Sequence, residues 1–387
     1  MKWLSVVGAR PNFIKIAPFC RAIEAHNAAL SPRDRARRIE HVLVHTGQHY
    51  DDRMSHAFFT ALDIPRADLN LNIGSGSHGE QVGRTMIEFE PVLARINPDL
   101  VIVVGDVNAT LACSVTARKQ GIPVAHIEAG LRSHDMGMPE EINRIVTDSV
   151  SDILLTPDHL ADENLRHEGH TDDQIRFVGN IMIDTLERER ARATGLNTQR
   201  MVAENLMADQ TDKSHDLRDD AFAVITLHRP SNVDDQTKLK HIVELLHFWS
   251  QQHLPLVWPI HPRTLKNISR AGWLRRLLDE PRILLTRPLD YHGMLNLNAH
   301  CRLILTDSGG LQEECCVLGT PCVTLRDNTE RPITLTDNGG TNRLTDIDGL
   351  PKALHTALNA PREPFTPELW DGRTAPRIVD ELMQAAD

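Results

Sequence analysis

The chain of 387 residues has no run of 18 apolar residues, the length that a membrane-spanning helix needs. Its first residues, MKWLSVVGARPNF, contain too short an apolar core for a signal peptide. Positive charge is also scarce, because 53 acidic residues against 42 Lys and Arg leave a formal net charge of −11. These features argue against a membrane, secretion or nucleic acid, so we expect a cytoplasmic protein.

Cysteines with the CxxC spacing of metal and redox sites are missing too. No CxxC is present, and most cysteines lie in or beside apolar runs, as buried thiols do in a reducing compartment. The six are Cys20, Cys113, Cys301, Cys315, Cys316 and Cys322. Metal binding has little support: there is no HExxH, and His45, which is four residues from His49, ends a predicted strand. We expect no disulfide, no zinc ribbon and no metal.

What the chain does contain is an alternation of short β-rich runs with helical patterns. The runs predicted as strands are residues 3–8, 41–47, 101–106, 124–130, 153–157, 175–180, 222–228, 256–261, 282–286, 303–307 and 322–327. They are nearly continuous in apolar residues, which is typical of strands covered on both faces. The sequence predicts an α/β protein of two Rossmann-like doubly wound domains facing a cleft. We assign residues 1–180 to the first domain, 181–365 to the second and 366–387 to a C-terminal helix.

Polar residues gather at or just beyond the ends of these runs. They are Arg10 and Lys15 after Gly8, Asp106, Glu128, His228, His261, the turn from Asp307 to Gly310, and Arg326 with Arg331. Ligands of open α/β sheets bind outside the carboxyl ends of the strands. Two such domains facing one another would bring these groups into one cleft.

The stretch LILTDSGGLQEECC, residues 303–316, combines an anion site with acids. Four apolar residues run into a glycine turn that opens a helix, which is a usual place for a phosphate. A carboxylate about two turns further on, where Glu313 and Glu314 lie, could accept hydrogen bonds from a ribose diol. An anion site with a nearby acid describes a nucleotide, and further acids opposite describe a nucleotide sugar.

Several of these features also have a simpler structural explanation. GARPNFIK could be only a turn and a helix start, and Glu140 could only complement a helix N-terminus. His228 could be a hydrogen-bonded core histidine. GSGSHG, residues 74–79, matches the dinucleotide pattern, but the preceding LNLNI alternates instead of forming a buried strand.

Eight motifs in order resemble the non-hydrolysing UDP-N-acetylglucosamine 2-epimerases. They are GARPNFIK, VVGDVNAT, HIEAGLRS, MPEEINR, ITLHRPSNVD, TDSGGLQEE, RDNTERP and GGTNRL. The resemblance implies a glycosyltransferase-B-like fold, a homodimer, no cofactor and a C-terminal helix that packs back on the first domain. It also implies interconversion of UDP-GlcNAc and UDP-ManNAc, through UDP and 2-acetamidoglucal, for bacterial surface polysaccharides.

The resemblance marks candidate site residues in both halves of the chain. The candidates for catalysis are Asp106, Glu128, Glu140, His228 and Lys15. The candidates for substrate binding are Arg10, Lys15, His228, His261, Met294, Ser308, Gly309, Gly310, Glu314 and Arg331. Cations and the helix start would stabilise a leaving diphosphate, while the acids handle a proton on opposite faces of the sugar C2. Which acid serves which face stays open.

Four points also stay open. The stretch between EAGLR and PEE is shorter than in many members, and HRPSN replaces HRRE, which leaves a regulatory UDP-GlcNAc site undecided. GARPNFIK and MPEEINR are also similar to epimerases of UDP-2,3-diacetamido-glucuronic acid. A glycosyltransferase would share the fold and the nucleotide site, and a sugar-nucleotide sensor would not need the three acids.

Overall fold

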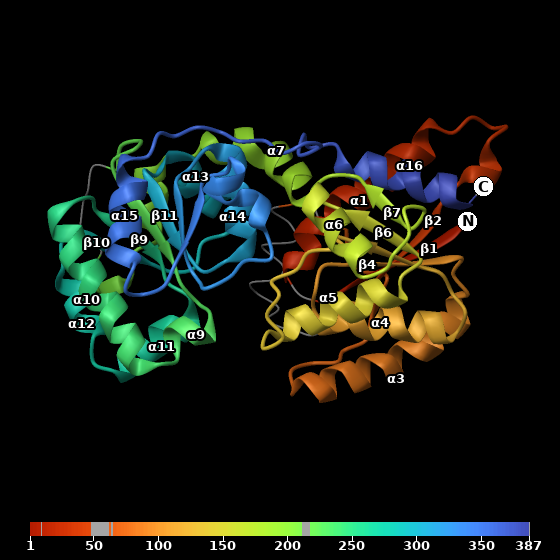
Figure 1. The fold of residues 1–387 in the computed structure, drawn as a ribbon, viewed down its shortest axis with the longest axis horizontal. Helices are drawn as coiled ribbons and strands as arrows, with labels where there is room; N and C mark the ends of the chain where they lie inside the picture. The colour runs from red at the N-terminus through yellow and green to blue at the C-terminus, as the bar shows by residue number, and fades with distance from the viewer. Residues whose placement is uncertain (9, 48–61, 63–64, 211–216, 387) are drawn as a thin grey trace. The chain divides into compact units, whose positions relative to one another are not determined.

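The computed structural model describes residues 1–8, 10–47, 62, 65–210 and 217–386. The chain forms two compact units. The first unit combines Met1–Arg188 with Pro367–Asp387, and the second is Glu189–Thr366. Each unit contains one parallel sheet with helices on both of its faces (Figure 1). The predicted α/β class is therefore confirmed, with two doubly wound sheets.

The sheet of the first unit has the strand order β3-β2-β1-β4-β5-β6-β7. Its strands are β1 Lys2–Val7, β2 Glu40–His45, β3 Leu69–Asn70, β4 Leu100–Val104, β5 Val124–Ile127, β6 Ile153–Thr156 and β7 Ile175–Phe177. Its helices are α1 Arg10–Ala29, η1 Arg35–Arg37, α3 His78–Ile96, α4 Asn108–Lys119, α5 Pro139–Val150, α6 His159–His167, the start of α7 Ile181–Thr194, and α16 Thr374–Ala386. In Figure 1, α1 and α16 lie above this sheet and α3, α4 and α5 lie below it.

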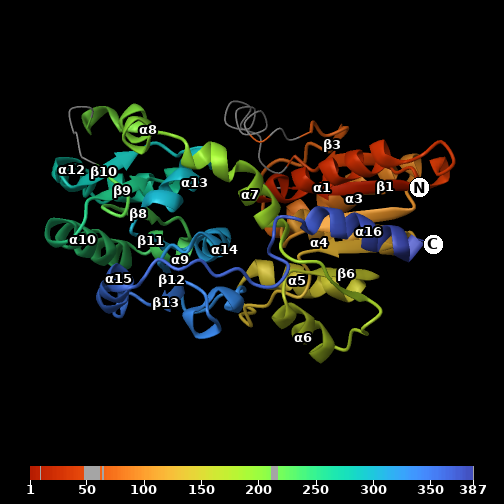
Figure 2. The ribbon, with the colours of Figure 1, turned by 90° about the horizontal axis from the view of Figure 1, so that it is seen from above.

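The sheet of the second unit has the strand order β10-β9-β8-β11-β12-β13. Its strands are β8 Ala223–Thr226, β9 Leu256–Pro259, β10 Ile283–Thr286, β11 Leu303–Thr306, β12 Cys322–Leu325 and β13 Asn342–Thr345. Its helices are α8 Thr198–Asn205, η2 Ala208–Gln210, α9 Pro230–Val233, α10 Gln236–Gln252, α11 Pro262–Arg270, α12 Leu274–Asp279, α13 Tyr291–His300, α14 Gly309–Leu318, η3 Pro332–Thr334, η4 Thr336–Asn338 and α15 Leu350–Asn359. Figure 2 shows α10 and α15 along one face of this sheet and α13 and α14 along the other.

Burial explains why the sequence signalled most of these strands. All five residues of β4 are buried, and so are all four of β11, because helices cover both faces. Every run predicted as a strand overlaps one of the observed strands. Two strands were missed, β3 and β13, and each pairs with a neighbour on one side only. An edge strand needs no continuous apolar run, so the short LN and NRLT segments left little signal.

All six cysteines are buried free thiols. In the part of the chain that the structure covers, no helix combines the length and the apolar character that crossing a bilayer requires. The segment GSGSHG ends in a helix start, because Ser77 caps α3 and forms a reciprocal capping box with Glu80. It therefore follows an edge strand and opens a surface helix, instead of linking a central strand to its crossover helix.

After the second unit, the chain returns to the first and is held there by buried polar contacts. The indole nitrogen of Trp370 donates a hydrogen bond to the Pro157 carbonyl at 2.8 Å. The carboxylate of Asp184 accepts the amides of Thr374 and Ala375 at 2.9 and 2.7 Å, which caps the start of α16. The last helix then packs along α1. These contacts belong to the core of the first unit.

Two glycines with almost the same backbone offer a matched test of this return. Gly179 has a φ of +91°, and a Cβ there would lie 2.2 Å from the carbonyl oxygen of Leu369. Gly169 has a φ of +93° with nothing within 4 Å. We expect Gly169→Ala to cost about 1–2 kcal/mol of unfolding free energy, for the left-handed backbone alone. Gly179→Ala should cost several kcal/mol, since the C-terminal segment must also move. Equal losses in urea unfolding would contradict this packing.

Candidate active site

At the carboxyl edge of the first sheet, Lys15 from α1 meets Glu128 from the end of β5. Both side chains are buried, and the Lys15 Nζ donates to the Glu128 Oε2. A Cβ on Gly105 would lie 3.2 Å from that Nζ and 3.3 Å from that Oε2, so the end of β4 also closes on the pair. Glu128 has a φ of +74°, which is uncommon without glycine. Such strained positions gather at functional sites, so a strained acid held by a lysine is a candidate for chemistry.

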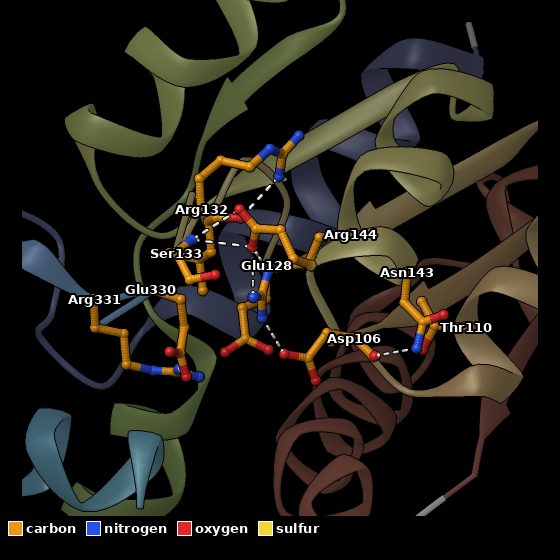
Figure 3. A network of polar contacts seen from close by, with 12 residues as sticks. Asp106, Thr110, Glu128, Arg132, Ser133, Asn143, Arg144, Glu330 and Arg331 are labelled. Atoms are coloured by element: carbon orange, nitrogen blue, oxygen red, sulfur yellow. Dashed lines mark hydrogen bonds and ion pairs between the residues drawn. The ribbon is translucent and has the colours of Figure 1, made fainter. Parts of the chain in front are cut away.

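Asp106 lies one residue beyond Gly105 and is held by α5. The Arg144 Nη1 donates to the Asp106 Oδ2 at 2.5 Å, and the Asn143 Nδ2 donates to the Asp106 carbonyl oxygen at 2.8 Å (Figure 3). The Asp106 side chain is 28% exposed, whereas that of Arg144 is 2% exposed. One oxygen of the carboxylate is therefore anchored in the protein while part of the group stays open to a ligand.

The adjacent acids Glu140 and Glu141 have different surroundings at the start of α5. Glu141 is buried and accepts the amides of Ser133 and His134 together with two bonds from Arg144. Burial alone would raise the pKa of Glu141, but these donors hold it below its ordinary value. Glu140 is half-buried, and within the described residues no hydrogen bond or ion pair engages its side chain. Glu141 is thus structural, and Glu140 is the acid open to a ligand.

At the carboxyl edge of the second sheet, Asp307 orients His228. The His228 Nδ1 lies 2.9 Å from the Asp307 Oδ1, which leaves Nε2 as the ring nitrogen for a ligand. Asp307 is fully buried and also accepts the amides of His228 and Arg229 and the Asn232 side chain. Burial would raise the pKa of Asp307, but the His228 ring and these donors lower it. The sequence placed Asp307 in the turn without showing that it holds a histidine 79 residues away.

The first turn of α14 is a candidate anion site. Ser308 is its N-cap without a side-chain cap bond, and Gly309 and Gly310 begin the helix. A Cβ on Gly309 would lie 2.7 Å from the Arg331 Nη1 and 2.5 Å from the Glu330 Oε1. Only glycine therefore lets the guanidinium approach the helix start, where backbone amides and the helix dipole already favour negative charge.

Arg331 is fixed by two buried acids of the second unit. Its Nη1 lies 2.5 Å from the Glu330 Oε1 (Figure 3). Its Nε lies 2.9 Å from the Glu313 Oε1. Glu330 also accepts the Arg326 Nη2 at 2.7 Å. Of the two neighbouring acids on α14, Glu313 therefore serves the arginine.

Glu314, the other acid, is buried among groups that carry no positive charge. Burial raises the pKa of Glu314 to about 7, and the negative charge of Glu313 adds to the effect. Tyr291 and Asn298 face the carboxylate and counteract part of this rise. In the described part of the chain, the Tyr291 hydroxyl and the Asn298 Nδ2 are nevertheless buried without a full hydrogen bond. A ligand with hydroxyl donors would satisfy Glu314.

The remaining candidates are placed less centrally. Arg10 begins α1, but its side chain lies outside the described residues. His261 is an exposed N-cap of α11, with its ring 5.5 Å from that of His228. Met294, on α13, packs partly buried against the core of the second unit. His49 lies outside the described residues, and within them no cluster of three or more His, Cys, Asp or Glu could hold a metal.

Comparison with known proteins gives consistent matches over nearly the whole chain. The family model described as UDP-N-acetylglucosamine 2-epimerase matches residues 33–383. A UDP-N-acetylglucosamine 2-epimerase of Methanocaldococcus jannaschii is 40% identical over 98% of both chains. A UDP-2,3-diacetamido-2,3-dideoxy-D-glucuronate 2-epimerase of Pseudomonas aeruginosa is 41% identical over 85% of this chain and 84% of the other.

Among solved structures, the chain is similar to the Methanocaldococcus jannaschii UDP-GlcNAc 2-epimerase in complex with UDP-GlcNAc and UDP. The TM-score is 0.85 at 39% identity, over 99% of this chain and 100% of that one. This likeness confirms the predicted glycosyltransferase-B-like fold class.

The raised pKa of Glu314 predicts a pH-dependent stability. The folded chain holds this proton up to about 7 instead of the ordinary 4.5, so stability falls as the pH rises between these values. Glu314→Gln has no carboxyl proton to lose, so its stability should not fall in this way. Between pH 5 and pH 8, we expect its unfolding free energy, measured in urea, to rise relative to that of the wild type by on the order of 2–3 kcal/mol. Glu244→Gln, at a half-exposed acid of the same unit, should show no such change. A pH-independent difference for Glu314→Gln would show that this acid is ionised throughout.

Proposed function

Because this chain belongs to the UDP-N-acetylglucosamine 2-epimerase family, we propose that it interconverts UDP-GlcNAc and UDP-ManNAc. The strongest support is that each unit contains a different set of the groups that such a substrate requires. The second unit combines an anion site with a buried acid that lacks a cation partner among the described residues. The first unit gathers Asp106, Glu128 and Glu140 near the carboxyl edge of its sheet. A nucleotide sugar needs both sets.

We place the nucleotide on the second unit. The amides of Gly309 and Gly310 and the Arg331 guanidinium suit the diphosphate, and Glu314 suits the two hydroxyls of the ribose. The Ser308 amide is less suited, because it donates to the Thr306 Oγ1 at 3.0 Å. The Nε2 of His228 suits the oxygen that leaves the sugar, since Asp307 already occupies Nδ1. His261 and Met294 complete the proposed binding residues.

We propose that epimerisation proceeds by elimination and re-addition. The C2 hydrogen of the sugar is not next to a carbonyl, so simple deprotonation is too costly. When a base takes the C2 proton, the C2–H electron pair forms the C1–C2 double bond, and UDP leaves C1 with the C–O pair. This gives 2-acetamidoglucal and bound UDP. UDP then adds back to C1 while an acid delivers a proton to C2 from the opposite face.

The proposed roles follow from charge. Lys15, Arg10 and His228 offset the charge that develops on the leaving diphosphate, together with the start of α14. Asp106, Glu128 and Glu140 supply the base and the acid. The Lys15–Glu128 contact ties the two functions together, because the same lysine also holds one of the acids.

A second candidate is 2-epimerisation of UDP-2,3-diacetamido-glucuronic acid. It is favoured by the Pseudomonas aeruginosa relative, which matches at an identity similar to that of the Methanocaldococcus jannaschii epimerase. The elimination chemistry is the same for both sugars, so the two substrates must be compared side by side. A UDP-sugar:acceptor transferase fits less well, because it needs no three acids around one sugar.

The first test is turnover in heavy water. The protein, without added NAD or metal, should convert UDP-GlcNAc into a mixture with UDP-ManNAc and place solvent deuterium at C2. NMR of the anomeric signals measures the conversion, and the loss of the C2 proton signal measures the exchange. UDP-ManNAc formed without deuterium would exclude the proton-transfer route, and turnover of the diacetamido sugar alone would select the second candidate.

The second test compares two acids in first helical turns. Glu140→Gln should lower kcat by about 100- to 10,000-fold with UDP affinity nearly unchanged, because the proposed proton transfer is lost. Glu80→Gln, in the first turn of α3, should keep its turnover and lose little stability, because its charge is exposed to solvent. Calorimetry and steady-state kinetics measure both. A Glu140→Gln variant that behaves like Glu80→Gln would remove Glu140 from the mechanism.

A further inference from the structure

Three polar side chains in the first two turns of helix α5 are buried at the carboxyl edge of the first sheet. Glu141, Asn143 and Arg144 are all buried, with Arg144 only 1% exposed. They share one helix with Glu140, which stays half-buried. The segment MPEEINR therefore brings one acid that is open to a ligand and three buried polar side chains to this edge of the sheet.

Two of these side chains hold Asp106 at two different points. The Arg144 Nη1 binds its Oδ2 at 2.5 Å, and the Asn143 Nδ2 binds its carbonyl oxygen at 2.8 Å. The Asn143 Nδ2 also lies 3.3 Å from the Asn108 Oδ1, at the start of α4. Side chains of α5 thus hold both the backbone and the carboxylate of Asp106 (Figure 3).

Glu141 in turn holds the guanidinium of Arg144 in place. Its Nε and Nη2 donate to the Glu141 Oε2 at 3.0 and 2.6 Å. The other Glu141 oxygen accepts the His134 amide at 2.7 Å, in the loop between β5 and α5. Arg144 therefore bridges one buried and one partly exposed carboxylate, and its planar fork has a single orientation that serves both.

We propose that Arg144 is a positioning residue for the epimerisation: its guanidinium, locked by Glu141, sets the direction of the Asp106 carboxylate. This inference rests on the proposed function, in which Asp106 handles the proton or charge at the sugar. Because Glu140 begins the same helix, α5 also sets the placement of one acid relative to the other. An error of about 1 Å in such an arrangement costs on the order of 100-fold in rate.

Lysine cannot replace this arginine. An ammonium is a compact point charge, and it lacks the planar fork that satisfies Glu141 and Asp106 at the same time. Arg144→Lys therefore keeps the charge and loses the orientation, whereas Arg144→Met loses both. The pair of variants separates the two contributions.

The test measures kcat, KM and UDP affinity for the whole protein. Arg144→Met should lower kcat by on the order of 100-fold while UDP affinity, which we assign to the second unit, is retained. Arg144→Lys should also lower kcat, because it keeps the charge without the planar fork.

Arg132→Met is the matched control. Arg132 is also a buried arginine of the first unit, but it pairs with Asp148 and Glu168. Its loss should reduce stability and leave kcat of the folded protein near the wild-type value. If Arg144→Met does not fold, Glu141→Gln is the milder change, because it loosens the guanidinium without removing it. That variant should still lower kcat with UDP affinity retained.

A double mutant gives the sharpest outcome. If Arg144 acts through Asp106, then Asp106→Asn with Arg144→Met should be no slower than the slower single variant. Multiplying losses, or wild-type kcat in folded Arg144→Met or Glu141→Gln, would overturn the positioning role. Failure of the wild type to epimerise either UDP-sugar would instead count against the proposed function, so the two failures are distinguishable.

Discussion

A charge buried in a protein interior must be paired, and this constraint organises both carboxyl edges of the molecule. Lys15 pairs with Glu128, and Arg144 bridges Asp106 and Glu141. In the second unit, Asp307 holds the ring of His228. Each ion pair fixes the orientation of a side chain that would rotate more freely if it were exposed to solvent. In each unit, the candidate site residues are therefore preorganised by the ion pairs that make their burial possible.

Glu314 is the informative exception. It is buried on α14, yet in the described part of the chain only uncharged groups and another acid face it. Its neighbour Glu313 has taken the available guanidinium of Arg331. The result is a pKa near 7, which marks a carboxylate whose charge is not yet compensated. The hydroxyl donors of a ribose would supply what the protein does not, which is how a binding site differs from a structural ion pair.

Backbone shape makes these contacts possible at a few special positions. Gly105 and Glu128 both have positive φ values, +69° and +74°, where β4 and β5 end. Gly309 lets Arg331 and Glu330 approach the first turn of α14 more closely than any Cβ would allow. Strain of this kind is tolerated where the surrounding contacts over-determine the conformation. The buried ion pairs provide such contacts.

The sequence alone determined the fold class, because strands buried on both faces leave continuous apolar runs that need no knowledge of their partners. It also located the glycine turn that opens α14, since glycines after a buried strand are a local signal. Tertiary structure alone decided which of two adjacent acids is locked. Glu141 and Glu140 look alike in MPEEINR, as do Glu313 and Glu314 in LQEECC. Their roles differ because of the groups that the fold brings to each acid: Glu141 meets Arg144 and two loop amides, and Glu313 meets Arg331. Other pairs of the two edges join segments far apart in the chain, since Lys15 and Glu128 are 113 residues apart, and Arg144 and Asp106 are 38 apart. The edge strands β3 and β13 were not predicted for a related reason: they are strands because of pairing with their neighbours, and not because of a pattern in their own sequence. Local pattern reports burial, whereas the pairing of charges depends on which distant segments meet.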